Sequence, residues 1–129
     1  MSDRRAQELT LIESIFGPTI HDDSITYVLF ERYELPSGWN RAHTRLLFNV
    51  PPAYPEIPPD CFYVSTGLLL ANGNQPTNYS EGANFLGTTW GQFSLHPVVE
   101  DWNPMPDPKD GHNLLTFMVV VRKRLEELN

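Results

Sequence analysis

The stretch YPEIPP, residues 54–59, decides how the rest of this 129-residue sequence is interpreted. It lies within PPAYPEIPPD, residues 51–60, where positions 51 to 59 hold five prolines in nine residues. Proline has no amide hydrogen to donate, so this segment cannot be a central strand of a sheet. We therefore expect a stiff connection, extended or turning, between two strands.

Strand patterns flank this connection on both sides. Residues 25–35 and 42–50 precede it, and residues 61–64 follow it; all three are rich in β-branched and aromatic residues. A turn signal, Pro36-Ser37-Gly38, separates the first two. We expect the first two strands to be antiparallel neighbours.

Helical patterns lie outside the strands. Residues 3–16 repeat apolar side chains at helical spacing and end at Gly17-Pro18. A second helix is expected near the C-terminus, with Asp110 or Asn113 as its cap. Its apolar face is formed by Leu114, Leu115, Met118, Val121, Leu125 and Leu128.

The pattern fades between residues 65 and 89, where glycine, asparagine, threonine and serine are frequent. A long irregular segment inside a compact domain is more often functional than idle. Strands grouped together, with helices outside them, predict an α+β fold. The length predicts one domain over residues 1–129.

Composition excludes several classes of protein. A single cysteine rules out an intrachain disulfide framework and a thiolate-rich zinc site. The formal charge of −7 argues against binding to nucleic acid or to an anionic membrane. The four histidines lack i, i+4 spacing, so no metal site is expected. Gly73 and Gly87 are isolated and form no phosphate-binding loop, and we expect no cofactor.

The first residues contain no apolar core of a secretory signal, and no run is long enough to span a bilayer. The sequence therefore predicts a cytoplasmic protein.

Two further motifs follow the proline stretch: WGQFSLH at residues 90–96 and Trp102-Asn103-Pro104. In this order and spacing, the three motifs resemble the ubiquitin-conjugating enzyme (UBC) superfamily. Between Leu9 and Leu125 the chain is most similar to its bacterial group called prokaryotic family E. The resemblance implies an N-terminal helix, an antiparallel β-meander, a long irregular active-site segment and a C-terminal helix.

The resemblance places the catalytic residue eight positions before Trp102, which is Ser94. The catalytic cysteine and the histidine-proline-asparagine motif of the superfamily are both missing. Cys61 lies in the strand after the proline stretch, so it does not fill the catalytic position. We interpret it as a small buried apolar residue.

Serine is not ionised at neutral pH, so Ser94 needs a neighbouring base. His96 lies two residues on, and alternate residues of an extended segment point to the same side. His96 is either this base or a structural hydrogen-bonding residue. An acylated Ser94 is an oxyester, whose formation requires stabilisation of an oxyanion. The sequence leaves that role open among Asn78, Asn84, Thr88 and Thr89.

Five other residues are candidates for supporting or partner-binding roles. Trp90 and Trp102 are expected to pack onto the core and support the site. Asp107 either orients an incoming lysine or forms a turn. The resemblance makes Arg4 and Arg5 candidates for a surface that binds the activating enzyme, and a solvated polar helix face is the alternative.

Tyr54 and Pro55 are further partner-binding candidates. The partners implied are a ubiquitin-like protein, an adenylating enzyme that activates it, and a metallopeptidase that removes it.

Three functions remain after these observations. The first is a bacterial conjugating transferase that receives the activated ubiquitin-like protein as an oxyester on Ser94 and passes it on. The second is a catalytically inactive UBC-like module that binds a ubiquitin-like protein or its activating enzyme non-covalently. An acidic adaptor unrelated to ubiquitin-like proteins is a weaker third.

Overall fold

A computed structural model describes residues 4–95 and 102–129 of the chain. These residues form an α+β structure with a helix at each end. The elements are α1 (Arg4–Phe16), β1 (Ile20–His21), β2 (Tyr27–Glu34), β3 (His43–Asn49), β4 (Cys61–Ser65), β5 (Tyr79–Phe85), β6 (Thr88–Ser94) and α2 (Leu114–Glu126). The expected helices and the three expected strands are confirmed, with bounds shifted by one or two residues.

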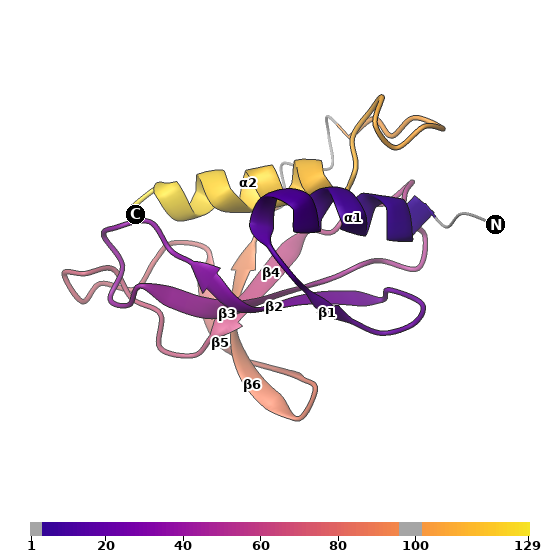
Figure 1. Ribbon diagram of the computed structural model, residues 1–129. Coiled ribbons are helices and arrows are strands. Elements are labelled where there is room, and N and C mark those ends of the chain that lie inside the picture. The colour runs from indigo at the N-terminus through magenta and orange to yellow at the C-terminus, as the bar shows by residue number, and fades with distance from the viewer. Residues whose placement is uncertain (1–3, 96–101) are drawn as a thin grey trace.

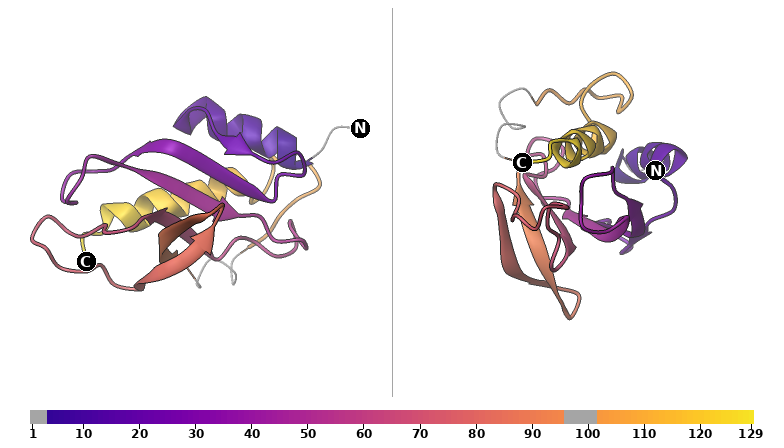
Figure 2. Two further views of the ribbon diagram at one scale, coloured as in Figure 1. Left: turned by 90° about the horizontal axis from the view of Figure 1, so that it is seen from below. Right: turned by 90° about the vertical axis from the view of Figure 1, so that its left-hand side faces the viewer.

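The six strands form one antiparallel sheet in the order β1-β2-β3-β4-β6-β5. Helices α1 and α2 lie side by side over one face of this sheet (Figures 1 and 2). The predicted pairing of the first two long strands is confirmed by the β2–β3 ladder. The proline connection joins β3 to β4 outside the ladder, as the missing amide hydrogens require.

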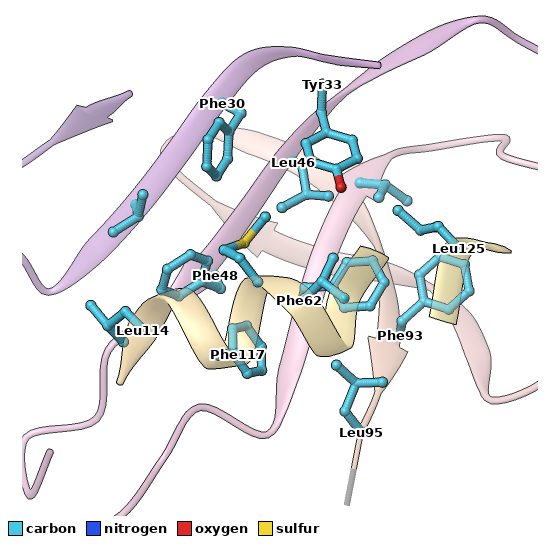
Figure 3. Close-up of a cluster of buried hydrophobic side chains, with 14 of the residues drawn as sticks. Phe30, Tyr33, Leu46, Phe48, Phe62, Phe93, Leu95, Leu114, Phe117 and Leu125 are labelled. Atoms are coloured by element: carbon cyan, nitrogen blue, oxygen red, sulfur yellow. The ribbon is translucent and has the colours of Figure 1, made fainter. Parts of the chain in front are cut away.

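The main core fills the space between α2 and the sheet (Figure 3). Phe117 of α2 packs against Phe48 of β3, with ring centroids 5.1 Å apart. Phe62 of β4 stacks on Phe93 of β6 at 4.8 Å. Phe117 is fully buried although the predicted helix face omitted it, whereas Leu128 lies beyond the helix and is 50% exposed. The apolar face of α2 is therefore broader than the heptad-like pattern indicated.

Of the two predicted caps, Asn113 is the residue that caps α2, which begins at the next residue. Its side chain accepts a hydrogen bond from the amide of Thr116, and the Thr116 hydroxyl accepts one from the Asn113 amide. This reciprocal capping box satisfies two amides that the first turn of a helix leaves without partners.

A second apolar cluster lies on the sheet face away from the helices. It is centred on Trp90 of β6, which is fully buried against Leu47 and Tyr63. The indole Nε1 donates to the carbonyl of Phe85 at 3.0 Å. The guanidinium of Arg45 lies 4.8 Å from the indole centroid, in cation–π geometry.

The expectation of an irregular segment over residues 65–89 is wrong for its second half, where β5 and the start of β6 form a hairpin. Its two turn residues, Leu86 and Gly87, have φ angles of 53° and 71°. Positive φ at both positions is typical of a type I′ hairpin turn. Leucine rarely adopts this conformation, so the sequence lacks the usual turn signal. Strand β5 is also an edge strand with mostly exposed side chains, so it shows no apolar alternation.

A fully buried carboxylate, that of Glu8, connects three parts of the chain. Its Oε1 accepts hydrogen bonds from the Tyr54 hydroxyl and from the Leu114 amide, the latter at 2.6 Å. Its Oε2 forms an ion pair with Arg4 Nε at 2.6 Å. Burial raises the pKa of Tyr54, so this phenol stays protonated and donates. Glu8 thus ties α1 to the proline connection and to the first residue of α2.

We predict that Glu8→Ala lowers the free energy of unfolding by about 3 kcal/mol, because a partly buried cation, a buried phenol and an amide lose their acceptor together. Urea denaturation followed by circular dichroism measures the change. Glu56→Ala, an exposed glutamate in the same connection, is the matched control and should change stability by less than about 0.5 kcal/mol. Equal effects of the two substitutions would contradict the role of Glu8.

Candidate functional site

Ser94 is the last residue of β6 and is half-buried. Its backbone is held from both sides: its amide donates to the carbonyl of Asn78 at 3.1 Å, and the next amide, of Leu95, donates to the carbonyl of Asp60 at 2.7 Å. Within the described residues, the Ser94 hydroxyl itself has no hydrogen-bond partner. The backbone at Ser94 is therefore fixed by hydrogen bonds from both neighbouring segments.

The alternation along β6 sets the direction of Ser94. Phe93 packs into the main core beneath the helices, whereas Trp90 belongs to the cluster on the opposite face. Side chains two or four positions apart on a strand share a face, so Ser94 lies on the face of Trp90. Both helices cover the other face of the sheet (Figure 2). The alternation along β6 therefore places Ser94 on the face that the helices leave uncovered.

Cys61 lies directly across the β4–β6 ladder from Ser94. Directly opposed residues have Cβ atoms ~5 Å apart and share a face of the sheet. The thiol is half-buried, 3.2 Å from the Asp60 carboxylate and 3.6 Å from the Tyr63 hydroxyl. Burial raises the pKa of the Cys61 thiol, which keeps it protonated and weakly nucleophilic. The sequence did not indicate this neighbour, because periodicity within a strand does not reveal the register between strands.

We predict that Cys61 in the folded protein reacts with iodoacetamide more slowly than in the urea-unfolded protein at the same pH, because the raised pKa reduces the thiolate fraction. Mass spectrometry of timed, quenched samples measures both rates. Free cysteine, assayed in buffer with and without urea, controls for the effect of urea on the reagent. Equal rates in the folded and unfolded protein would show that the thiol is not protected.

The sequence-predicted polar residues before Ser94 divide into two groups. Asn84 and Thr89 lie opposite each other near the hairpin turn, where the Thr89 hydroxyl donates to the Asn84 carboxamide at 3.1 Å. Thr88 is paired with Phe85 at the same end of the hairpin. Thr88 and Thr89 lie six and five positions before Ser94 on β6, and Asn84 lies opposite Thr89 on β5, so the structure does not bring Asn84 to Ser94. Asn78, in contrast, is bonded to Ser94 through its backbone.

Trp102 anchors the loop between the site and α2. Its Nε1 donates to the carbonyl of Pro55 at 2.7 Å. The indole also lies 6.1 Å from the Tyr54 ring and 5.4 Å from the His112 ring, measured between centroids. His112 Nδ1 in turn accepts from the Asn103 amide at 2.7 Å. The loop of residues 102–113 is thereby fixed to the proline connection.

Three features can be compared with known families: the order of the elements, the proline connection before β4, and the position of Ser94 eight residues before Trp102. The model of the family described as Prokaryotic E2 family E matches residues 8–128. The chain belongs to this family. Its α+β architecture is consistent with the UBC-like fold. Comparison with curated proteins and with solved structures gave no match.

Membership of the prokaryotic E2 family supports a general role in ubiquitin-like protein conjugation and suggests contact with ubiquitin-like proteins and their activating enzymes. In the ranges 4–95 and 102–129, neither helix is long and apolar enough to cross a membrane. The same ranges hold no group of three or more acidic, cysteine or histidine residues that could hold a metal ion. His96, predicted to be either the base or a structural hydrogen-bonding residue, lies outside the described residues.

The two arginines proposed for partner binding are engaged within this E2-family chain. Besides its ion pair with Glu8, Arg4 bonds the carbonyl of His112 at 3.2 Å. Arg5 bonds the carbonyls of Ile25 and Pro51 at 2.9 and 3.1 Å. These contacts favour a structural role for both guanidinium groups over a partner-binding role.

Tyr54 and Pro55 are similarly engaged in the fold, through the phenol of the first and the carbonyl of the second. Asp107 accepts a hydrogen bond from the Lys109 amide at 3.0 Å, and its own carbonyl accepts from the Asp110 amide at 3.0 Å. This arrangement agrees with the turn-forming interpretation of Asp107.

Proposed function

We propose that this E2-family chain accepts the activated C-terminus of a ubiquitin-like protein from an adenylating partner, holds it as an oxyester on Ser94, and transfers it to an acceptor. The observation that carries the proposal is the placement of Ser94: it ends β6, its backbone is bonded on both sides, and its hydroxyl is without a partner in the described part of the chain. A fixed nucleophile on a rigid strand favours acyl transfer, since misplacement by about 1 Å can cost about 100-fold in rate.

In the charging step, Ser94 Oγ adds to the carbonyl carbon of the activated C-terminus and forms a C–O bond. The tetrahedral intermediate collapses, and the bond to the leaving group (AMP or a thiolate of the partner) breaks with its electron pair. The hydroxyl proton passes to a base, for which we propose His96. Discharge reverses these roles: an acceptor amine adds to the ester carbon, and Ser94 Oγ leaves and takes up a proton.

Cys61 is a poor alternative carrier. Its raised pKa disfavours the thiolate, and its thiol is directed into contacts with Asp60 and Tyr63. The proposed setting is the bacterial cytoplasm, where a metallopeptidase that removes the modifier completes the system.

We expect the chain, incubated with its activating enzyme, ATP and the modifier, to form a covalent adduct that survives reductant and is cleaved by hydroxide. Ser94→Ala should abolish this adduct, whereas Cys61→Ala, the matched change on the opposing strand, should preserve it. Denaturing gels and intact-mass spectrometry measure both. An adduct lost with Cys61→Ala and sensitive to reductant would overturn the serine assignment. Complex formation without any adduct would instead support the non-covalent binding module.

Ser94→Cys should convert the adduct to a thioester that is released by reductant, because the position rather than the oxygen determines acyl transfer. Thioesters react faster with amines than oxyesters, so discharge to free lysine should also accelerate. Gel assays with and without reductant, at several lysine concentrations, measure both changes. A Ser94→Cys chain that accepts no modifier while the native chain does would show that the geometry is specific to oxygen.

A further inference from the structure

We propose that Arg124 of α2 is a positioning residue for Ser94, because it holds the segment to which the Ser94 amide is bonded. This inference rests on the proposed function and adds to it a residue from a distant part of the chain. Arg124 acts through Thr77, which directly precedes Asn78, and through Phe93, which directly precedes Ser94.

Ser94 lies where the pairing between β5 and β6 ends. The last pair of the ladder is Tyr79 with Phe93, and beyond it the Ser94 amide donates to the carbonyl of Asn78 at 3.1 Å. Asn78 is exposed and precedes the first residue of β5. The ends of regular elements open at a low free-energy cost. The bond that fixes Ser94 on this side therefore depends on what holds residues 77–78.

Arg124 holds this segment from the end of α2. The residue is only 7% exposed, and its Nη2 donates to the carbonyl of Thr77 at 2.8 Å. The same guanidinium donates to the backbone oxygens of Glu127 and Asn129, each at 3.1 Å. The Thr77 amide also donates to the backbone oxygen of Asn129, at 3.2 Å. Thr77 is therefore fixed at both its amide and its carbonyl.

Arg124 also contacts the strand that carries Ser94. Its guanidinium carbon lies 5.0 Å from the centroid of the Phe93 ring, in cation–π geometry. Phe93 is fully buried, and its ring lies 4.9 Å from that of Tyr79, measured between centroids. One planar cation therefore contacts the residue before each partner of the hydrogen bond between Ser94 and Asn78.

The burial of a cation at this position is informative. Burial lowers the pKa of Arg124, yet arginine remains protonated in proteins, so its charge must be matched by hydrogen bonds. An apolar side chain would pack at the end of α2 without this cost. What arginine adds is a planar fork whose donors reach several oxygens at once. Its contact with Thr77 is thus the feature that an apolar residue could not replace.

This contact bears on the reaction because acyl transfer requires the Ser94 hydroxyl to meet a carbonyl carbon in one orientation. Misplacement of a reacting group by about 1 Å can cost about 100-fold in rate. Without Arg124, residues 77–78 lose their link to α2, and the end of β6 is free to separate from them. We therefore expect slower charging of Ser94 without weaker recognition of the chain by the activating enzyme.

The test replaces Arg124 by methionine, which keeps an unbranched apolar side chain and removes the guanidinium. Arg122→Met is the matched control, because this arginine of the same helix is exposed and lies over the Phe16 ring, 5.7 Å from its centroid. Amide hydrogen exchange of the full chain, followed by NMR, measures local opening without any partner protein. The Leu95 amide is the internal standard, since it donates to Asp60 beside β4.

We expect Arg124→Met to speed exchange of the Ser94 amide at least about tenfold relative to that of Leu95, the size expected for lost hydrogen bonds to a charged group. Arg122→Met should leave this ratio unchanged. An equal change at both amides would show that Arg124 only stabilises the fold, and would overturn the proposal. If Arg124→Met does not fold, Arg124→Lys, which lacks the planar fork, is judged by the same ratio.

Charging with the activating enzyme, ATP and the modifier is the second measurement. We expect the kcat for charging Arg124→Met to fall at least about tenfold, with the KM of the activating enzyme for the chain unchanged. A native kcat together with faster exchange at Ser94 would overturn the role of Arg124 in the reaction and leave the oxyester proposal intact. Absence of any base-labile adduct in the native chain would refute the proposed function itself, and with it the role of Arg124.

Discussion

The buried carboxylate of Glu8 is the interaction on which the rest of the structure depends. A charge removed from water is tolerated only when its lone pairs and its charge are matched, and here a cation, a phenol and a backbone amide match them. Each partner comes from a different element, so the ion sets the relative position of α1, the proline connection and α2. Apolar packing alone, being non-directional, would leave the helices freer to slide over the sheet.

The dipeptide Tyr54-Pro55 extends this constraint toward the site. The Tyr54 side chain turns inward to Glu8, while the Pro55 carbonyl accepts the indole of Trp102. The loop that leads into α2 is thus anchored to the same connection that leads into β4. Strand β4 in turn pairs with β6 at Ser94, and Asp60, just before β4, accepts the amide of Leu95. A series of polar contacts therefore links the buried carboxylate of Glu8 to the backbone at Ser94.

Local features of the structure could be predicted from the sequence, and features that depend on distant contacts could not. Missing amide hydrogens predict the proline connection. Hydrophobic periodicity predicts the helices α1 and α2 and the strands β2 to β4. Strand β5 was missed because an edge strand has no buried face to produce alternation, and because Leu86 occupies a turn position where glycine or asparagine is usual. Ser94 was located by motif spacing, but Cys61 and Asn78 became its neighbours only through strand register. Arg4 appeared to be a solvated helix residue because its buried partner lies one turn further along the same helix.

The exposed edge formed by β5 has a consequence for how this protein behaves at high concentration. An unpaired strand edge is a template on which other chains can add, and such addition starts aggregation. Here the edge is interrupted at Gly82, where the register shifts between Glu81 and Ala83, and it carries few apolar side chains. A bulge and a charge on an edge strand both disfavour continuation of the sheet into a second molecule. Strand β5, which the sequence indicated most weakly, thus keeps this edge of the sheet from starting aggregation.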